Sequence, residues 1–159
     1  MVKETTNPED LDDFVKHFPN SAHASVATLR AGQLRRAASS VVAIGVVLNQ
    51  AWTDTGVYLT PGKTFTVTAR GTMNWYTGAC GGKGVSSPAG IPCPGGGPKP
   101  QGLTYLSLIG KIGQNGRPFN VGESFNGKAE VGGELFLGPN DDNLADNTGN
   151  WTAQVVAQR

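Results

Sequence analysis

The polar residues between Gly138 and Trp151 have the types and spacing that could hold a metal ion. The stretch reads GPNDDNLADNTGNW, with three carboxylates and four asparagines. No Lys, Arg or His occurs between Ala129 and Gln158. Calcium prefers oxygen ligands from carboxylates, amides and backbone carbonyls, so the stretch predicts a calcium-binding loop. The alternative is an ordinary surface turn, because Asn, Asp and Gly also favour turns.

The spacing within this loop differs from that of known helix–loop–helix calcium sites. Asn140-Asp141 and Asp146-Asn147 form two pairs separated by four residues. An EF-hand instead needs alternating ligands and a glutamate at its twelfth position. A loop that folds back on itself would aim both pairs, and a carbonyl between them, at one ion.

Catalytic residues are not evident in the chain. It lacks a P-loop, a dinucleotide-binding fingerprint and an HExxH motif. His17 and His23 fall in a helical region far from any nucleophile. We therefore do not expect an enzyme.

Length, charge and hydropathy exclude several classes of protein. The 159 residues suffice for one domain and a small appendage. A net charge of +1 gives no electrostatic footprint for nucleic acid. No apolar run approaches the roughly 20 residues of a membrane helix. The polar N-terminus is not a secretory signal peptide, which predicts a cytoplasmic location or a non-classical export route.

The first 38 residues read as a helical hairpin. Asn7-Pro8 is a typical helix start, followed by apolar residues at helical spacing up to Phe18. A second helix is expected over about 22–37. Its buried face is predicted to carry Ala22, Val26, Leu29 and Leu34.

Residues 39–159 change to a period of two and read as a β-sandwich of seven or eight short strands. Strands are expected at 41–48, 57–59, 64–69, 103–112, 117–121, 133–137 and 151–157. Residues 72–76 are expected either to continue the strand at 64–69 or to turn onto a neighbouring strand. The Gly- and Pro-rich segment 78–102 is predicted to be a loop. It contains Cys80 and Cys93, for which a disulfide and two free thiols are equally compatible with the sequence.

The hairpin resembles the helix pairs of bacterial tetratricopeptide-like proteins over FVKHFPNSAHASVATLR. One such pair cannot bury its apolar faces alone. The resemblance therefore implies docking on the following domain, on a second copy in a homo-oligomer, or on a protein partner. The alternative is that the hairpin only packs and joins.

From about Asn49 to Gln158 the chain resembles the LecA-type bacterial lectins. The resemblance runs through short pieces in the same order. They are Asn49–Trp52, Thr60–Gly62, Gly71–Trp75, Gln101–Leu103, Leu108–Gly113, Pro118–Gly122, Gly133–Leu137 and the series ND-x4-DN-x-G-x-W. The family implies a galactose-binding-like jelly-roll sandwich that binds galactose through a calcium ion.

The resemblance also implies a role for each matching residue. Asp141 would bridge ion and sugar, and Asp146 and Asn147 would be side-chain ligands. Backbone carbonyls of Asn143 or Leu144, and of Trp75 or Tyr76, would complete the coordination. Sugar contacts would come from Gln101, Asp141, Asn143, Asp146 and Tyr76. Asp142 would be a bystander.

The sequence departs from these lectins where the sugar is gripped. The histidine that precedes the glutamine in the family has no counterpart, because Pro98 or Lys99 stands there. The loop between the two Asx pairs is also shorter. The sequence is therefore compatible with two functions. One is a calcium-dependent module that binds galactose-like carbohydrates. The other is a non-catalytic structural or interaction domain whose calcium only stabilises the loop. Trp75 and Tyr76 are expected either to offer an aromatic platform for a sugar ring or to pack in the core or at its rim.

Overall fold

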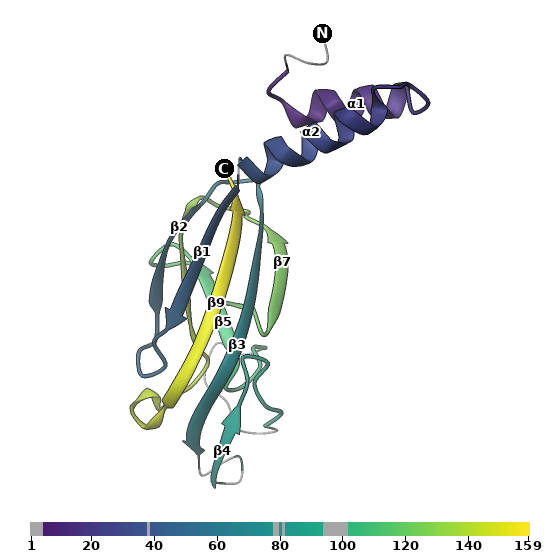
Figure 1. Ribbon diagram of the computed structural model, residues 1–159. Coiled ribbons are helices and arrows are strands. Elements are labelled where there is room, and N and C mark those ends of the chain that lie inside the picture. Colours follow the sequence, from purple (N-terminus) through teal and green to yellow (C-terminus); the bar gives the residue numbers. More distant parts are fainter. Residues whose placement is uncertain (1–4, 38, 78–79, 81, 94–101) are drawn as a thin grey trace. The chain divides into compact units, whose positions relative to one another are not determined.

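The fold was analysed in a computed structural model, which describes residues 5–37, 39–77, 80, 82–93 and 102–159 (Figure 1). The chain divides into two compact units, essentially Met1–Ser40 and Val41–Ala157. No helix in the described ranges is both long enough and apolar enough to span a membrane.

The first unit is a helical hairpin of α1 (Pro8–His17) and α2 (Ala24–Ala37). The predicted start of α1 is confirmed, because the Asn7 side chain accepts a hydrogen bond from the Glu9 N–H at 3.1 Å. The second helix begins later than predicted. A turn precedes it, in which the Ala24 N–H donates to the Ser21 carbonyl at 3.0 Å.

The prediction for the buried face of α2 holds for Leu34, which packs against the hairpin core, and is wrong for Ala22, Val26 and Leu29, which are exposed. Its buried residues in the hairpin core are Ala27 and Ala31, which pack with Leu11 of α1. Val26 and Leu29 are 58% and 61% exposed. The side chains that contact α1 from the middle of α2 are therefore small alanines, and the larger Val26 and Leu29 remain exposed.

The second unit is a sandwich of two antiparallel sheets (Figure 1). The first sheet has the order β1 (Ser39–Val46), β9 (Thr148–Gln158), β3 (Thr64–Thr77), β4 (Gly82–Ser86), with β7 (Ser124–Lys128) also paired to β3. The second sheet has the order β2 (Thr53–Leu59), β8 (Gly133–Pro139), β5 (Leu108–Ile112), β6 (Phe119–Asn120). The predicted β-sandwich preceded by a helical hairpin is confirmed.

Alternating side chains from both sheets form one core. Val67, Met73 and Trp151 come from the first sheet, and Leu108 and Leu135 from the second. All five are fully or almost fully buried. Their removal from water is the main stabilising contribution, at about 1.5–3 kcal/mol for each large side chain.

Residues 72–76 continue the strand expected at 64–69, which was one of the two alternatives, and both segments belong to β3. Two other strand predictions need correction. The strand expected over 103–112 begins only at Leu108, since Leu106 has a left-handed backbone with φ 54°. Strands β4 and β7 were missed, and β4 lies inside the segment predicted to be a loop.

Gly84 explains why β4 was missed. It pairs with Trp75 across the β3–β4 ladder. A Cβ atom at Gly84 would lie 2.5 Å from the Trp75 ring. Glycine is therefore needed here for close packing, although the same residue in a sequence normally indicates a loop.

Cys80 and Cys93 form a disulfide with a Cα–Cα distance of 5.5 Å. This decides between the two alternatives that the sequence left open. Both cysteines are partly buried and pack against the sandwich core. The disulfide closes the end of the β3–β4 hairpin onto the segment that leads toward Tyr105.

Candidate cation-binding site

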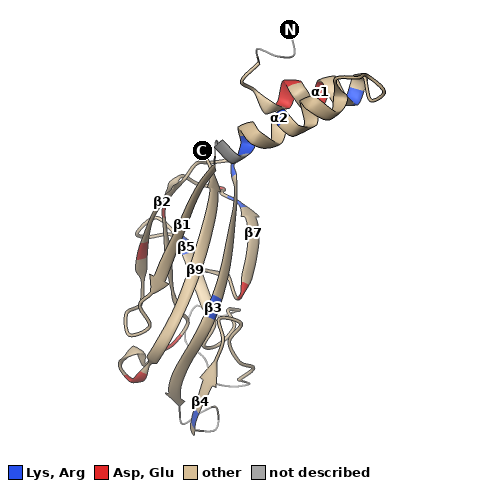
Figure 2. Cartoon of the chain, viewed as in Figure 1, with Lys and Arg blue, Asp and Glu red and all other residues tan. Residues whose placement is uncertain are grey.

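The candidate site is the loop of residues 140–147, which connects β8 to β9 and contains the short 3-10 helix η1 (Leu144–Asp146). Figure 2 shows acidic residues on the loop that leads into β9. Asn140 fixes its first end. The Asn140 side-chain amide donates to the Thr104 carbonyl at 2.7 Å, and its backbone N–H donates to the Ser107 carbonyl at 2.8 Å.

Asn147 fixes the other end of the loop. Its side-chain amide nitrogen donates to the Leu48 carbonyl at 3.1 Å, which connects the loop to the β1–β2 connection. The residue is 5% exposed. Because Nδ2 is held by Leu48, the Asn147 Oδ1 atom points the other way. That oxygen is buried and has no hydrogen-bond partner among the described residues.

Two carboxylates in the loop also have a buried oxygen without a hydrogen-bond partner among the described residues. These oxygens are Asp141 Oδ2 and Asp146 Oδ1. An unsatisfied buried polar atom costs about 1–3 kcal/mol. Three such oxygens lie within seven residues of chain, so this loop carries a local group of acceptors that no described donor satisfies.

Asn143 holds the remaining oxygen of each carboxylate. Its backbone N–H donates to Asp141 Oδ1 at 3.1 Å, and its side-chain amide donates to Asp146 Oδ2 at 2.5 Å. One oxygen of each acid is thus fixed, and the other is left available. This arrangement orients both carboxylates before any ligand binds.

The electrostatics of the loop favour a cation. Burial raises the pKa of Asp141 above its ordinary value of 3.8, and the nearby charges of Asp146 and Asp142 raise it further. The hydrogen bond from the Asn143 backbone N–H and the proximity of the Asn147 side-chain amide act in the opposite direction and lower the pKa. Desolvation is the largest of these effects, so the ionised carboxylate is poorly solvated where it stands.

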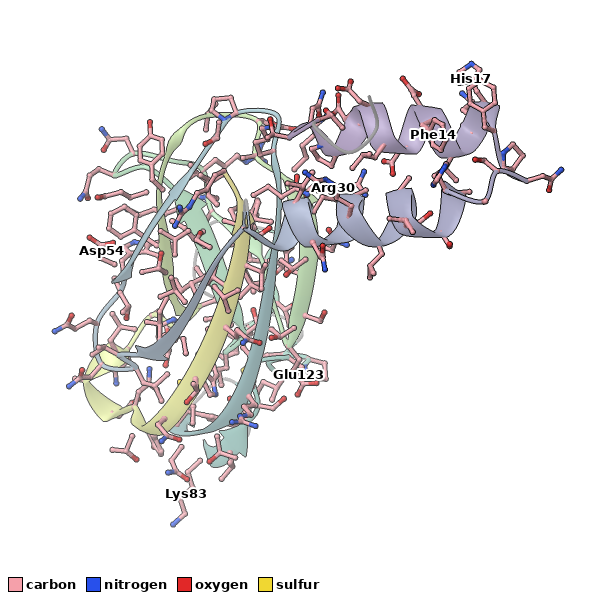
Figure 3. The ribbon with its side chains drawn as sticks, turned by 45° about the horizontal axis from the view of Figure 1, so that its top comes forward. Phe14, His17, Arg30, Asp54, Lys83 and Glu123 are labelled. Carbon is pink, nitrogen blue, oxygen red and sulfur yellow. A yellow bond between two sulfur atoms is a disulfide. The ribbon has the colours of Figure 1, made fainter. Side chains whose placement is uncertain are left out.

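The end of β3 lies beside the loop. A cavity of about 500 Å³ is lined by Asp146, by Asn74–Tyr76 of β3 and by Lys83–Val85 of β4. The last β3–β9 pair joins Asn74 to Thr148, so Trp75 and Tyr76 extend past the start of β9. Figure 3 shows the labelled Lys83 side chain extending away from the strands.

The two aromatic residues of this segment face opposite ways. Trp75 is 8% exposed and belongs to the sandwich core, whereas Tyr76 is 60% exposed. Of the two readings left open for them, core packing holds for the Trp75 ring. The ring of Tyr76 is accessible beside the cavity.

The other predicted site residues lie as follows. Asp142 is exposed and accepts a hydrogen bond from the Tyr105 hydroxyl at 3.2 Å. The Leu144 carbonyl accepts the Asn147 N–H at 3.3 Å. Gln101 lies outside the described residues. The double role of Asn143 was missed, although an Asp two residues before an Asn is a typical Asx-turn signal.

The donor set fits a hard cation. Among the residues that the structure describes, no group of three or more His, Cys, Asp or Glu side chains is arranged to hold a metal ion. The loop instead offers two carboxylates, one side-chain amide oxygen and backbone carbonyls. Calcium accepts such a mixed set of oxygens.

A likeness to known proteins is found among solved structures. No protein-family model and no curated protein matches the chain. Among solved structures, it is similar to the "EclA N-terminal domain; PllA-like lectin", with a TM-score of 0.57 and 25% sequence identity. The match covers 74% of this chain and 96% of the other. The sandwich is therefore a lectin-like β fold.

Proposed function

We propose that the β-sandwich is a calcium-dependent carbohydrate-binding module whose ion sits in the loop of residues 140–147. The observation that carries the proposal is the set of three buried, unpartnered oxygens on Asp141, Asp146 and Asn147. A calcium ion would satisfy all three and would neutralise the two acids. The lectin-like neighbour supports the carbohydrate part of the proposal.

The proposed ligands combine side chains with backbone. Asp141, Asp146 and Asn147 would bind through the three oxygens named above. Backbone carbonyls of Asn143 or Leu144 would add a further ligand, and the carbonyl of Trp75 or Tyr76 would approach from β3. Calcium takes six to eight oxygens, so this set leaves positions for sugar hydroxyls.

The proposed sugar contacts lie around the same cavity. The exposed Tyr76 ring offers an apolar face to a sugar ring, and Asn143 has a polar side chain at the loop surface. Asp141 and Asp146 would contact sugar hydroxyls next to the ion. Gln101 completes the proposed set by its resemblance to the lectins. Galactose-like sugars are the ligand class that this resemblance implies.

The test separates ion binding from sugar binding. Calcium titration by calorimetry should give one site per chain, which Asp141→Asn removes and Asp142→Asn retains. Glycan-array binding should then require calcium and should weaken in Tyr76→Ala. The highest calcium concentration should be about 10 mM, roughly ten times the weakest dissociation constant typical of extracellular calcium modules. The absence of calcium binding at that concentration would refute the site.

The alternative function is a structural or interaction domain whose calcium only stabilises the loop. The exposed apolar side chains of α2 in the helical unit favour it, since Val26 and Leu29 face away from α1. Calcium binding together with no retention on any arrayed glycan would select this alternative. The tetratricopeptide-like nature of the hairpin stays a prediction.

A further inference from the structure

The sandwich contains a second cavity, which is apolar and does not involve the loop of residues 140–147. Its volume is about 690 Å³, larger than that of the cavity beside Asp146. It lies where the chain crosses from β6 of the second sheet to β7 of the first sheet. Ligand pockets for small molecules typically measure about 300–1,000 Å³.

Three phenylalanines form the wall of this cavity. The Phe125 ring centroid lies 5.2 Å from that of Phe65 and 5.0 Å from that of Phe119. Phe65 is buried, whereas Phe119 and Phe125 are only partly buried. The cavity thus presents aromatic surface that the protein itself leaves partly uncovered.

Two of these rings pack closely against glycine residues. A Cβ atom at Gly110 would lie 2.9 Å from the Phe119 ring, and one at Gly127 would lie 2.6 Å from the Phe125 ring. The Phe119 ring therefore lies against the neighbouring strand β5, and the Phe125 ring lies over Gly127 of its own strand β7. A side chain at either glycine would displace the ring, so both glycines are needed for the aromatic wall.

The rim of the cavity carries an excess of positive charge. Arg117, Lys128 and Glu130 line it, and all three are exposed. Within the described ranges, neither Arg117 nor Lys128 forms an ion pair. Two cations against one carboxylate favour a ligand with a single negative charge.

We propose that this cavity binds a small aromatic monoanion, a planar apolar group of about naphthalene size that bears one sulfonate or carboxylate. The aromatic part lies against the phenylalanine wall, where stacked or tilted ring pairs are favourable. The acidic group faces Arg117 and Lys128. Val131, which is 56% exposed, closes the rim beside them.

This site is independent of the proposed calcium site. Phe65 and Trp75 stand ten positions apart on β3, which separates them by about 33 Å along an extended strand. Occupation of one site therefore leaves the other accessible. The inference rests on the fold and not on the proposed function.

The test uses the full chain and two fluorescent probes that share an aromatic framework. One is 8-anilinonaphthalene-1-sulfonate, an anion, and the other is neutral N-phenyl-1-naphthylamine. The anion should bind saturably with one molecule per chain, equally in calcium and in chelator. Arg117→Gln and Lys128→Gln should each weaken the anion about fivefold, a typical effect for one partly exposed charge, and leave the neutral probe unchanged.

A matched pair of variants tests the location. Val131→Glu adds a negative charge at the rim and should weaken the anion at least about tenfold. Val41→Glu, at an equally exposed valine on β1, should have no effect. Both sites are exposed, so circular dichroism and the unfolding midpoint should remain at wild-type values. Equal effects of the two variants, or the absence of saturable binding, would overturn the proposal.

Amide NMR shifts provide a second readout that does not depend on fluorescence. The anion should move the signals of Gly116 and Gly127, which lie in or next to the cavity wall. The signal of Gly149, at the start of β9, should stay in place. Shifts spread evenly over the sandwich would contradict a single site.

Discussion

Replacing Asp141 with Asn should have opposite effects in chelator and in calcium. In chelator, the change removes a poorly solvated charge beside Asp146 and keeps the size of the side chain. The Asn oxygen can still accept the hydrogen bond from the Asn143 N–H. We therefore expect the variant to be at least as stable as the wild type when no calcium is present.

In calcium, the wild type should gain stability and the variant should not. Three buried oxygens without partners allow a gain of about 3–9 kcal/mol if a cation satisfies them all. At 100 times its dissociation constant, calcium adds about 2.7 kcal/mol, slightly less than the lower end of that range. For a protein of this size the unfolding midpoint should rise by about 5–10 °C.

The assay is thermal unfolding at neutral pH, with calcium and with chelator, on three proteins. Asp142→Asn is the matched control, because it makes the same change at the neighbouring residue. Its side chain is exposed and can still accept from the Tyr105 hydroxyl, so most of the calcium shift should persist. A full calcium shift in Asp141→Asn, or its loss in Asp142→Asn, would refute the ligand assignment.

Three further outcomes follow from the structure. Without calcium, the wild type should gain stability relative to Asp141→Asn as pH falls from neutral toward 3.8, because the raised pKa makes the folded state bind the proton more tightly than the unfolded state; paired urea titrations across pH measure the difference. Replacing both Cys80 and Cys93 by serine should lower the free energy of unfolding, measured in urea, by about 3 kcal/mol. The reason is that the disulfide joins residues 13 positions apart in the sequence and so restricts the unfolded chain. Gly149→Ala should cost about 2 kcal/mol or more in the same assay, because Gly149 has φ +105° and its new Cβ atom would lie 2.4 Å from the Thr72 carbonyl oxygen; no loss would show that the strand relaxes freely.

The candidate site could be located from the sequence because most of it is local. Asp141, Asp146 and Asn147 lie in one short connection, so their spacing is visible without knowledge of the fold. The structure leaves one buried oxygen of each residue without a partner among the described residues. The contacts that orient this loop come from far away in the chain, as with the Leu48 carbonyl, and spacing alone could not reveal them.

The fold was predictable where side chains alternate and less so where glycine replaces them. Strand β9 alternates buried and exposed residues along most of its length and was recognised. Strand β4 carries Gly82 and Gly84, which read as a loop until the Trp75 ring across the ladder is known. The buried face of α2 was partly misjudged for a related reason. In the hairpin core, α2 buries the small residues Ala27 and Ala31.

The pairing of β3 with β9 also has a consequence for folding kinetics. Phe65 pairs with Ala157 and Asn74 with Thr148, so the central ladder of the first sheet joins segments far apart in the chain. Such long-range contacts slow folding, because chain entropy is lost before they form. The loop of residues 140–147 reaches β3 only once this ladder exists. Any ion held there should therefore prolong the lifetime of the folded state by slowing unfolding, and the refolding rate should stay nearly the same.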